Sequence, residues 1–85
     1  MQRVKIYSKP MCPFCERAKR LFEKKGAEYE EVNIASSASI RDQMISEAGG
    51  RMTVPQIFIG DTHVGGWDDL SALDEAGELD TLLEG

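Results

Sequence analysis

The sequence is poor in several residues that mark common protein classes. It has two cysteines, one histidine, one tryptophan and three prolines among 85 residues. Two cysteines are too few for a secreted disulfide scaffold, which favours a reducing, cytoplasmic setting. No apolar run approaches the roughly 20 residues that cross a bilayer, and the first residues lack a signal-peptide pattern. We therefore expect no membrane partner.

The composition is otherwise that of an ordinary globular protein. Hydrophobic residues make up 41% of the chain and charged residues 29%. A chain of 85 residues has room for one hydrophobic core. We expect residues 1–85 to form a single domain and the protein to be a monomer.

Charge is distributed unevenly along the chain. Residues 1–26 carry eight basic and two acidic side chains, whereas residues 27–85 carry two basic and thirteen acidic ones. The basic residues lie in one short segment without interleaved aromatic residues, so nucleic-acid binding is not favoured. They form either a solvated helix face or a positive potential that favours a thiolate and attracts an anionic thiol.

The two cysteines form a Cys12-Pro13-Phe14-Cys15 motif, and sulfurs three positions apart at a helix start can close as a disulfide and open again. Cys15, Ala18 and Phe22 share one face of a helix predicted over residues 14–25. Cys12 precedes the first turn, at an exposed helix mouth, where unpaired backbone N–H groups would lower the pKa of its thiol. We predict that Cys12 is the nucleophile and Cys15 the resolving thiol.

A partial zinc site is the alternative interpretation of a cysteine pair. Zinc usually takes four protein or water ligands, and His63 is the only histidine that could join the two thiols. We therefore predict no metal, and we expect His63 to be an exposed residue of a hairpin.

Hydrophobic periodicity and turn residues predict the element order β-α-β-α-β-β-α. We expect strands at residues 4–7, 28–34, 56–59 and 62–64, helices at 14–25, 39–48 and 67–76, and a last short helix at 78–83. Ser36, Ser37 and Ser39 are candidate N-caps of the second helix, and Ser39 has capping-box spacing to Asp42. Strands joined by a crossover helix pair in parallel, and hairpin strands pair in antiparallel. The fold class is therefore α/β, with a four-stranded mixed sheet flanked by helices on both faces.

Three motifs in this order resemble those of the dithiol glutaredoxins of the thioredoxin-fold superfamily. They are Cys12-Pro13-Phe14-Cys15, Thr53-Val54-Pro55 and Gly65-Gly66-Trp67-Asp68-Asp69, and the similarity runs from about Val4 to Leu83. The resemblance implies a thioredoxin fold and glutathione as co-substrate. It also implies that the substrates are protein disulfides and glutathionylated proteins.

The resemblance also implies a glutathione site. Its residues would be Lys9, Phe14, Thr53, Val54, Pro55, Gly66, Trp67 and Asp68, assisted by Arg41 or Gln43. Pro55 would be cis, the Val54 backbone would pair with the glutathione cysteine, and Lys9 would face the glycyl carboxylate. The helix start at Trp67 would face the γ-glutamyl carboxylate and Asp68 its ammonium group. Asp69 would be an ordinary helix-start acid.

Two positions depart from the commonest pattern of the family. Phe14 stands where tyrosine is frequent, and Trp67 stands where cysteine or a small residue is frequent. These departures bear on substrate preference and not on the class of reaction.

The sequence thus predicts a glutathione-dependent thiol–disulfide oxidoreductase that works through the Cys12 thiolate. Two alternatives are an iron–sulfur cluster carrier and a hydrogen donor for a reductase such as ribonucleotide reductase, recycled by thioredoxin reductase. Pro13 argues against the cluster carrier, because a stiff residue hinders the loop adjustment that cluster ligation needs.

Overall fold

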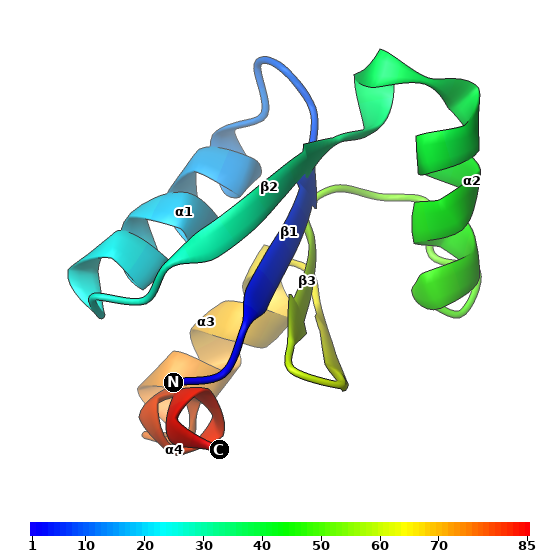
Figure 1. The fold of residues 1–85 in the computed structure, drawn as a ribbon. Coiled ribbons are helices and arrows are strands. Elements are labelled where there is room, and N and C mark those ends of the chain that lie inside the picture. The colour runs from blue at the N-terminus through cyan, green and yellow to red at the C-terminus, as the bar shows by residue number, and fades with distance from the viewer.

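The computed structural model describes residues 1–85 and has a four-stranded mixed sheet at its centre (Figure 1). The elements are β1 (Val4–Ser8), α1 (Pro13–Lys24), β2 (Tyr29–Asn33), the 3-10 helix η1 (Ile34–Ser36), α2 (Ala38–Glu47), β3 (Gln56–Ile59), β4 (Thr62–Gly65), α3 (Trp67–Glu75) and α4 (Leu79–Glu84). The strand order is β2-β1-β3-β4, with β1 parallel to β2, and with β3 antiparallel to both β1 and β4. This confirms the predicted sheet, and the fold is the thioredoxin fold.

Helices cover both faces of the sheet, as predicted. One buried cluster joins β1 and β3 to three helices; its members are Val4, Ile6, Ala18, Phe22, Ala27, Ile57, Ile59, Leu70, Leu79 and Leu83. These residues place α1, α3 and α4 on one face, and α2 lies on the other side of the sheet (Figure 1). Met44 and Ala48 are buried on the α2 side.

A cluster of polar and aromatic residues attaches α2 to the sheet. The Lys5 ammonium lies 2.7 Å from the Glu47 carboxylate and 3.2 Å from the Tyr7 hydroxyl, which donates to Glu47 at 2.8 Å. The hydrogen bond from Lys5 lowers the pKa of Glu47. Burial alone would lower the pKa of Lys5, but its bonds to Glu47 and Tyr7 raise it. The ion pair is therefore kept over the whole neutral range.

Two element boundaries differ from the prediction by one residue, and a side-chain hydrogen bond sets each of them. The strand predicted to reach residue 34 ends at Asn33, whose side chain accepts from a backbone N–H two residues further on and starts η1. The cap of α2 is Ser37, which accepts from the Ile40 N–H at 3.2 Å. Ser37 is one of the three candidate caps, and Ser39, the candidate with capping-box spacing, lies inside the first turn of that helix.

The two ends of the chain lie side by side next to α4 (Figure 1). The Gln2 N–H donates to the Leu83 carbonyl at 2.6 Å. This bond ties the start of β1 to the last helix. None of the helices has both the length and the apolar character needed to cross a membrane.

Candidate active site

The three motifs singled out in the sequence meet at one end of the sheet. Tyr7 of β1 pairs with Gln56 of β3, and Ile57 of β3 pairs with Gly65 of β4. The carboxyl end of β1, the amino end of β3 and the carboxyl end of β4 therefore lie together. A four-residue loop leads from β1 into α1, and a single residue leads from β4 into α3. Both of these helices begin at this end.

The cysteine pair lies at the start of α1. Cys12 is the N-cap and forms a disulfide with Cys15, with 5.2 Å between their Cα atoms. The Cys15 backbone N–H donates to the Cys12 sulfur at 3.2 Å. An N–H group at a helix start that already points at the sulfur stabilises negative charge on that sulfur.

The two cysteines differ less in exposure than the sequence suggested. Cys15 is completely buried, and Cys12 is only 7% exposed instead of lying at an open helix mouth. The reason is that the Cys12 sulfur turns into the first turn of α1, towards Cys15. The asymmetry between the two sulfurs remains, because only Cys12 has any surface.

Apolar side chains form a rim beside the disulfide. Met11, directly before Cys12, has a φ of +58° and a side chain that is 99% exposed. The Phe14 ring is 49% exposed, and the Arg17 guanidinium lies 5.3 Å from its centroid. The mouth of the site is therefore apolar with a cation next to it.

The buried side chain of Gln56 holds the loop that precedes β3. The Val54–Pro55 peptide bond is cis, as the resemblance implied, and Pro55 is buried. The Gln56 amide nitrogen donates to the Thr53 carbonyl at 3.0 Å and to the Thr53 hydroxyl at 3.2 Å. The sequence pattern predicts only that Gln56 is a residue of the strand at 56–59.

The start of α3 is joined to the same loop by Arg51. Asp69 accepts from the Gly66 N–H at 2.9 Å and from the Arg51 guanidinium at 3.2 Å. The hydrogen bond from Gly66 lowers the pKa of Asp69 most, and the bond from Arg51 lowers it further. A Cβ atom on Gly66 would lie 3.5 Å from the Pro55 carbonyl oxygen, so the two segments are in contact.

Arg51 was not among the predicted site residues. A signal was available, since Arg51 is one of only two basic residues after residue 26 and stands two positions before Thr53.

The remaining candidate residues lie around this end without direct bonds to one another. Lys9 is exposed in the loop between β1 and α1, and Asp68 is exposed in the first turn of α3. Trp67 is half-buried and packs against the core cluster. On α2, Arg41 is exposed, whereas Gln43 donates to Glu47 at 2.9 Å. Gln43 is therefore partly engaged within its own helix.

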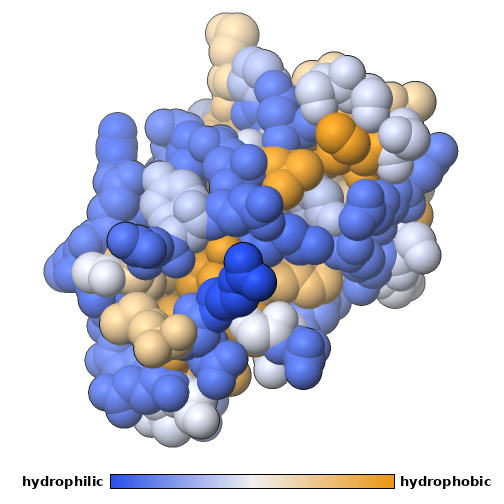
Figure 2. Space-filling model, viewed as in Figure 1, coloured by the Kyte–Doolittle hydropathy of each residue, from blue (hydrophilic) through white to orange (hydrophobic).

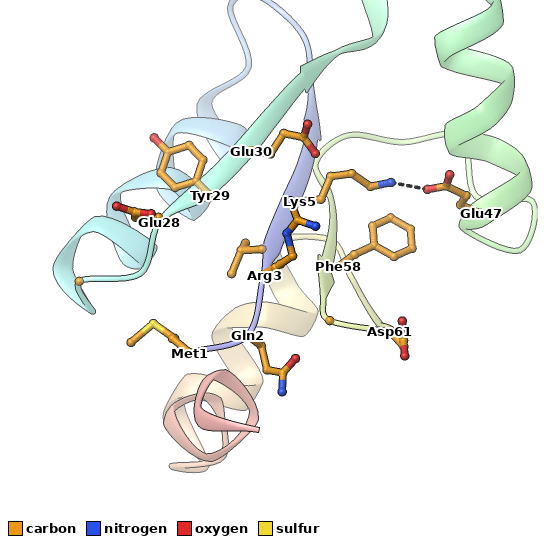
Figure 3. A pocket seen from close by; sticks show the side chains of 13 residues that line it. Met1, Gln2, Arg3, Lys5, Glu28, Tyr29, Glu30, Glu47, Phe58 and Asp61 are labelled. Atoms are coloured by element: carbon orange, nitrogen blue, oxygen red, sulfur yellow. Dashed lines mark hydrogen bonds and ion pairs between the residues drawn. The ribbon is translucent and has the colours of Figure 1, made fainter.

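A broad surface depression lies at the opposite end of the sheet (Figure 3). It is an open groove of about 940 Å³ lined by Met1 to Lys5, by Phe58 and by the β3–β4 turn at Gly60 and Asp61, among others. Hydrophilic residues cover most of the face shown in Figure 2, and apolar residues show only in small separate areas. The groove holds neither cysteine, so we assign the active site by its chemistry and not by the size of a cavity.

The sequence is similar to those of known proteins. A family model described as Glutaredoxin matches residues 4–64. Glutaredoxin 3 of Escherichia coli strain K12 is 51% identical over 84 residues, which make up 99% of this chain and 100% of that protein.

Solved structures agree with the sequence comparison. The solution structure of a glutaredoxin from Brucella melitensis has a TM-score of 0.85 and 51% identity, covering 98% of this chain and 89% of that one. The crystal structure of a buckwheat glutaredoxin–glutathione complex has a TM-score of 0.87 and 31% identity, covering 95% of this chain and 76% of that one. The chain therefore belongs to the glutaredoxin family of thiol–disulfide oxidoreductases.

Proposed function

We propose that this protein is a dithiol glutaredoxin, which uses glutathione to reduce protein disulfides and glutathione mixed disulfides through Cys12. The observation that carries the proposal is the hydrogen bond from the Cys15 N–H to the Cys12 sulfur at the start of α1. The same N–H would stabilise the thiolate that the reaction needs. Membership of the family supports the glutathione dependence.

The reaction is a series of thiol–disulfide exchanges. The Cys12 thiolate attacks one sulfur of a substrate disulfide, a new S–S bond forms, and the departing thiolate takes a proton from water. The Cys15 thiolate then attacks the Cys12 sulfur and releases the second substrate thiol. The protein is left as the Cys12–Cys15 disulfide, which is the bonded state of the structure.

Two glutathione molecules return the protein to its dithiol form. The first glutathione thiolate attacks Cys12 and frees Cys15, and the second attacks the bound glutathione sulfur and leaves as glutathione disulfide. One substrate disulfide and two glutathiones thus give two substrate thiols and one glutathione disulfide. With a glutathionylated substrate, Cys12 alone suffices, because the glutathionyl group passes to Cys12 and then to a second glutathione.

The glutathione site would be the segment Thr53–Pro55 together with the start of α3. Val54 would offer backbone N–H and C=O groups to the glutathione cysteine. Trp67 and Asp68 would meet the γ-glutamyl group, at the helix end that favours an anion. The structural likeness to a glutaredoxin–glutathione complex supports this placement.

The exposed groups around the site would complete it. Lys9 and Phe14 would lie on the opposite side of the sulfur, with Lys9 towards the glycyl carboxylate. Arg41 or Gln43 would assist from α2, and Gly66 would let the backbone approach the ligand. The proposal further takes residues 1–85 as one domain of a cytoplasmic, monomeric protein, without nucleic-acid or membrane partners and without a bound metal.

Single-cysteine variants test the proposal. Cys15→Ser should keep the reduction of glutathione mixed disulfides, whereas Cys12→Ser should abolish it. The measurement is glutathione-coupled turnover of a glutathionylated peptide. Appreciable turnover by Cys12→Ser would contradict the assignment of the nucleophile. The comparisons do not favour the alternatives of a cluster carrier or of a hydrogen donor for a reductase.

A further inference from the structure

One buried polar side chain near the site is not used by the proposed chemistry. Gln56 is completely buried, and its amide nitrogen donates to both the carbonyl and the hydroxyl of Thr53. Its amide oxygen lies 2.8 Å from the Nε2 atom of His63 on β4. A continuous row of hydrogen bonds thus runs from the β3–β4 hairpin to the loop in front of β3.

The Thr53 carbonyl fixes the direction of every hydrogen bond in this row. The Thr53 carbonyl oxygen can only accept, so the Gln56 nitrogen must face Thr53 and the Gln56 oxygen must face His63. His63 must therefore carry a proton on Nε2. Its ring is also stacked on Phe58, with 4.8 Å between centroids and 23° between the planes. His63 is thus half-buried and held on two sides, which corrects the expectation of an exposed hairpin residue.

We propose that Gln56 and His63 are positioning residues that hold Thr53, and with it the loop that binds glutathione. Thr53 is an exposed loop residue, and the polar groups of such residues commonly bond water. Burying an amide to bond these groups instead restricts the loop to one conformation. A loop fixed before binding loses less freedom when the ligand arrives, and this raises affinity.

This inference rests on the proposed function. It concerns two residues, Gln56 and His63, that contact no reacting atom. Removing the Gln56 amide should weaken glutathione binding while leaving the chemistry at Cys12 unchanged. We expect Gln56→Met, which keeps the length of the side chain, to raise KM for glutathione about three- to tenfold, the range of one hydrogen bond. The kcat value and the pH dependence of Cys12 alkylation should remain those of the unaltered protein.

The His63 position gives an independent pair of variants. His63→Phe keeps a ring to stack on Phe58 but removes the Nε2 proton, and we expect it to raise KM in the same direction. His63→Gln brings back a side-chain N–H donor and should restore KM at least in part. These changes are at a half-buried position, so they decide the question if Gln56→Met does not fold.

A control variant separates positioning from general loss of stability. Ile59→Val removes one methylene group from the core cluster at the far end of β3, on the face of the sheet away from Gln56. It should lower the unfolding temperature without changing KM. The direct measurement is the dissociation constant of S-methylglutathione, which cannot react, determined for all variants by titration calorimetry.

The possible results distinguish a failure of the positioning role from a failure of the proposed function. If the unaltered protein binds S-methylglutathione and Gln56→Met or His63→Phe binds it within twofold as well, the positioning role is wrong and the proposed function stands. An equal loss in Ile59→Val would also overturn the positioning role. If the unaltered protein neither binds S-methylglutathione nor turns over glutathione, the proposed function itself is wrong.

Discussion

At the scale of single residues, Asp69 joins the two segments that flank the disulfide. Its carboxylate accepts from Gly66 and from Arg51, and both bonds stabilise the charged form, so the pKa of Asp69 is lowered. A carboxyl with a lowered pKa in the folded state adds stability above its unfolded pKa of about 3.9, and this stability is lost as the pH falls through the folded pKa.

The predicted consequence is a smaller acid sensitivity in Asp69→Asn. Asparagine keeps an oxygen that can accept from the Gly66 N–H but removes the charge. We expect the variant to lose less than about 1 kcal/mol at neutral pH, because the carboxylate is about half exposed. Its free energy of unfolding should also fall less steeply below about pH 4. Urea-induced unfolding between pH 2.5 and 7 measures this, and a curve parallel to that of the unaltered protein would contradict the role of the charge.

The contacts of single residues at the site could be predicted only in part. Asp69 was expected to be a helix-start acid, since acids in the first turn are readable from the sequence alone. Its partner Arg51 is 18 positions away, and only the sheet register brings them together. The bond between Gln56 and His63 likewise depends on how the hairpin closes, so an alternating strand pattern gave no sign of it.

At the scale of secondary-structure elements, α1 begins at the disulfide and packs its apolar stripe, Ala18 and Phe22, against the sheet. Ala18 and Phe22 are completely buried in the core cluster together with Leu70 of α3. The stripe therefore fixes the position and rotation of the helix whose N-cap is Cys12. Loss of packing along α1 should act on stability first.

Phe22→Ala should destabilise the oxidised protein by about 3–5 kcal/mol, because it leaves a large cavity in the core. This is a large part of the roughly 5–15 kcal/mol that stabilise a typical small domain. The measurement is the urea midpoint at unchanged slope. The matched control is Arg20→Ala on the exposed side of the same helix, which should stay within about 0.5 kcal/mol. Similar losses in both variants would show that the stripe does not carry the packing of α1.

Elements with strong periodicity were predictable, whereas their ends were not. The stripe through Cys15 and Phe22 marked α1 to within a residue, and Gly60-Asp61 marked the hairpin turn. The end of β2 and the start of α2 each differ from the prediction by one residue, because Asn33 and Ser37 bond nearby backbone groups. Several polar residues in that segment offered equivalent caps, and the sequence did not choose among them.

At the scale of the whole molecule, the basic residues of the first third are not all free to act on a substrate. Lys19 forms ion pairs with Glu16 and Glu31, and Lys25 with Asp74 and Asp80. These pairs neutralise basic side chains locally and tie α1 to β2, α3 and α4. If a positive potential acts at the disulfide, its source is therefore the basic residues outside these pairs.

Lys9 and Arg17 are the basic residues nearest to Cys12 in the sequence, and neither forms an ion pair within the chain. The rest of the molecule is acidic, with a net charge of −5 for the whole chain. An anionic thiol such as glutathione should be attracted to this end of the molecule and repelled elsewhere. The attraction should weaken with salt, because surface charges are screened.

We therefore expect kcat/KM for glutathione to fall at least about twofold between about 0.01 and 0.1 M salt, as the screening length drops from about 30 to about 10 Å. The uncharged thiol 2-mercaptoethanol should show almost no change. Arg17→Gln should lower kcat/KM at low salt and flatten the dependence, whereas Lys24→Gln, with the same change in net charge at the far end of α1, should do neither. Equal slopes for the two thiols, or equal effects of the two variants, would show that the basic residues of α1 are only a solvated helix face.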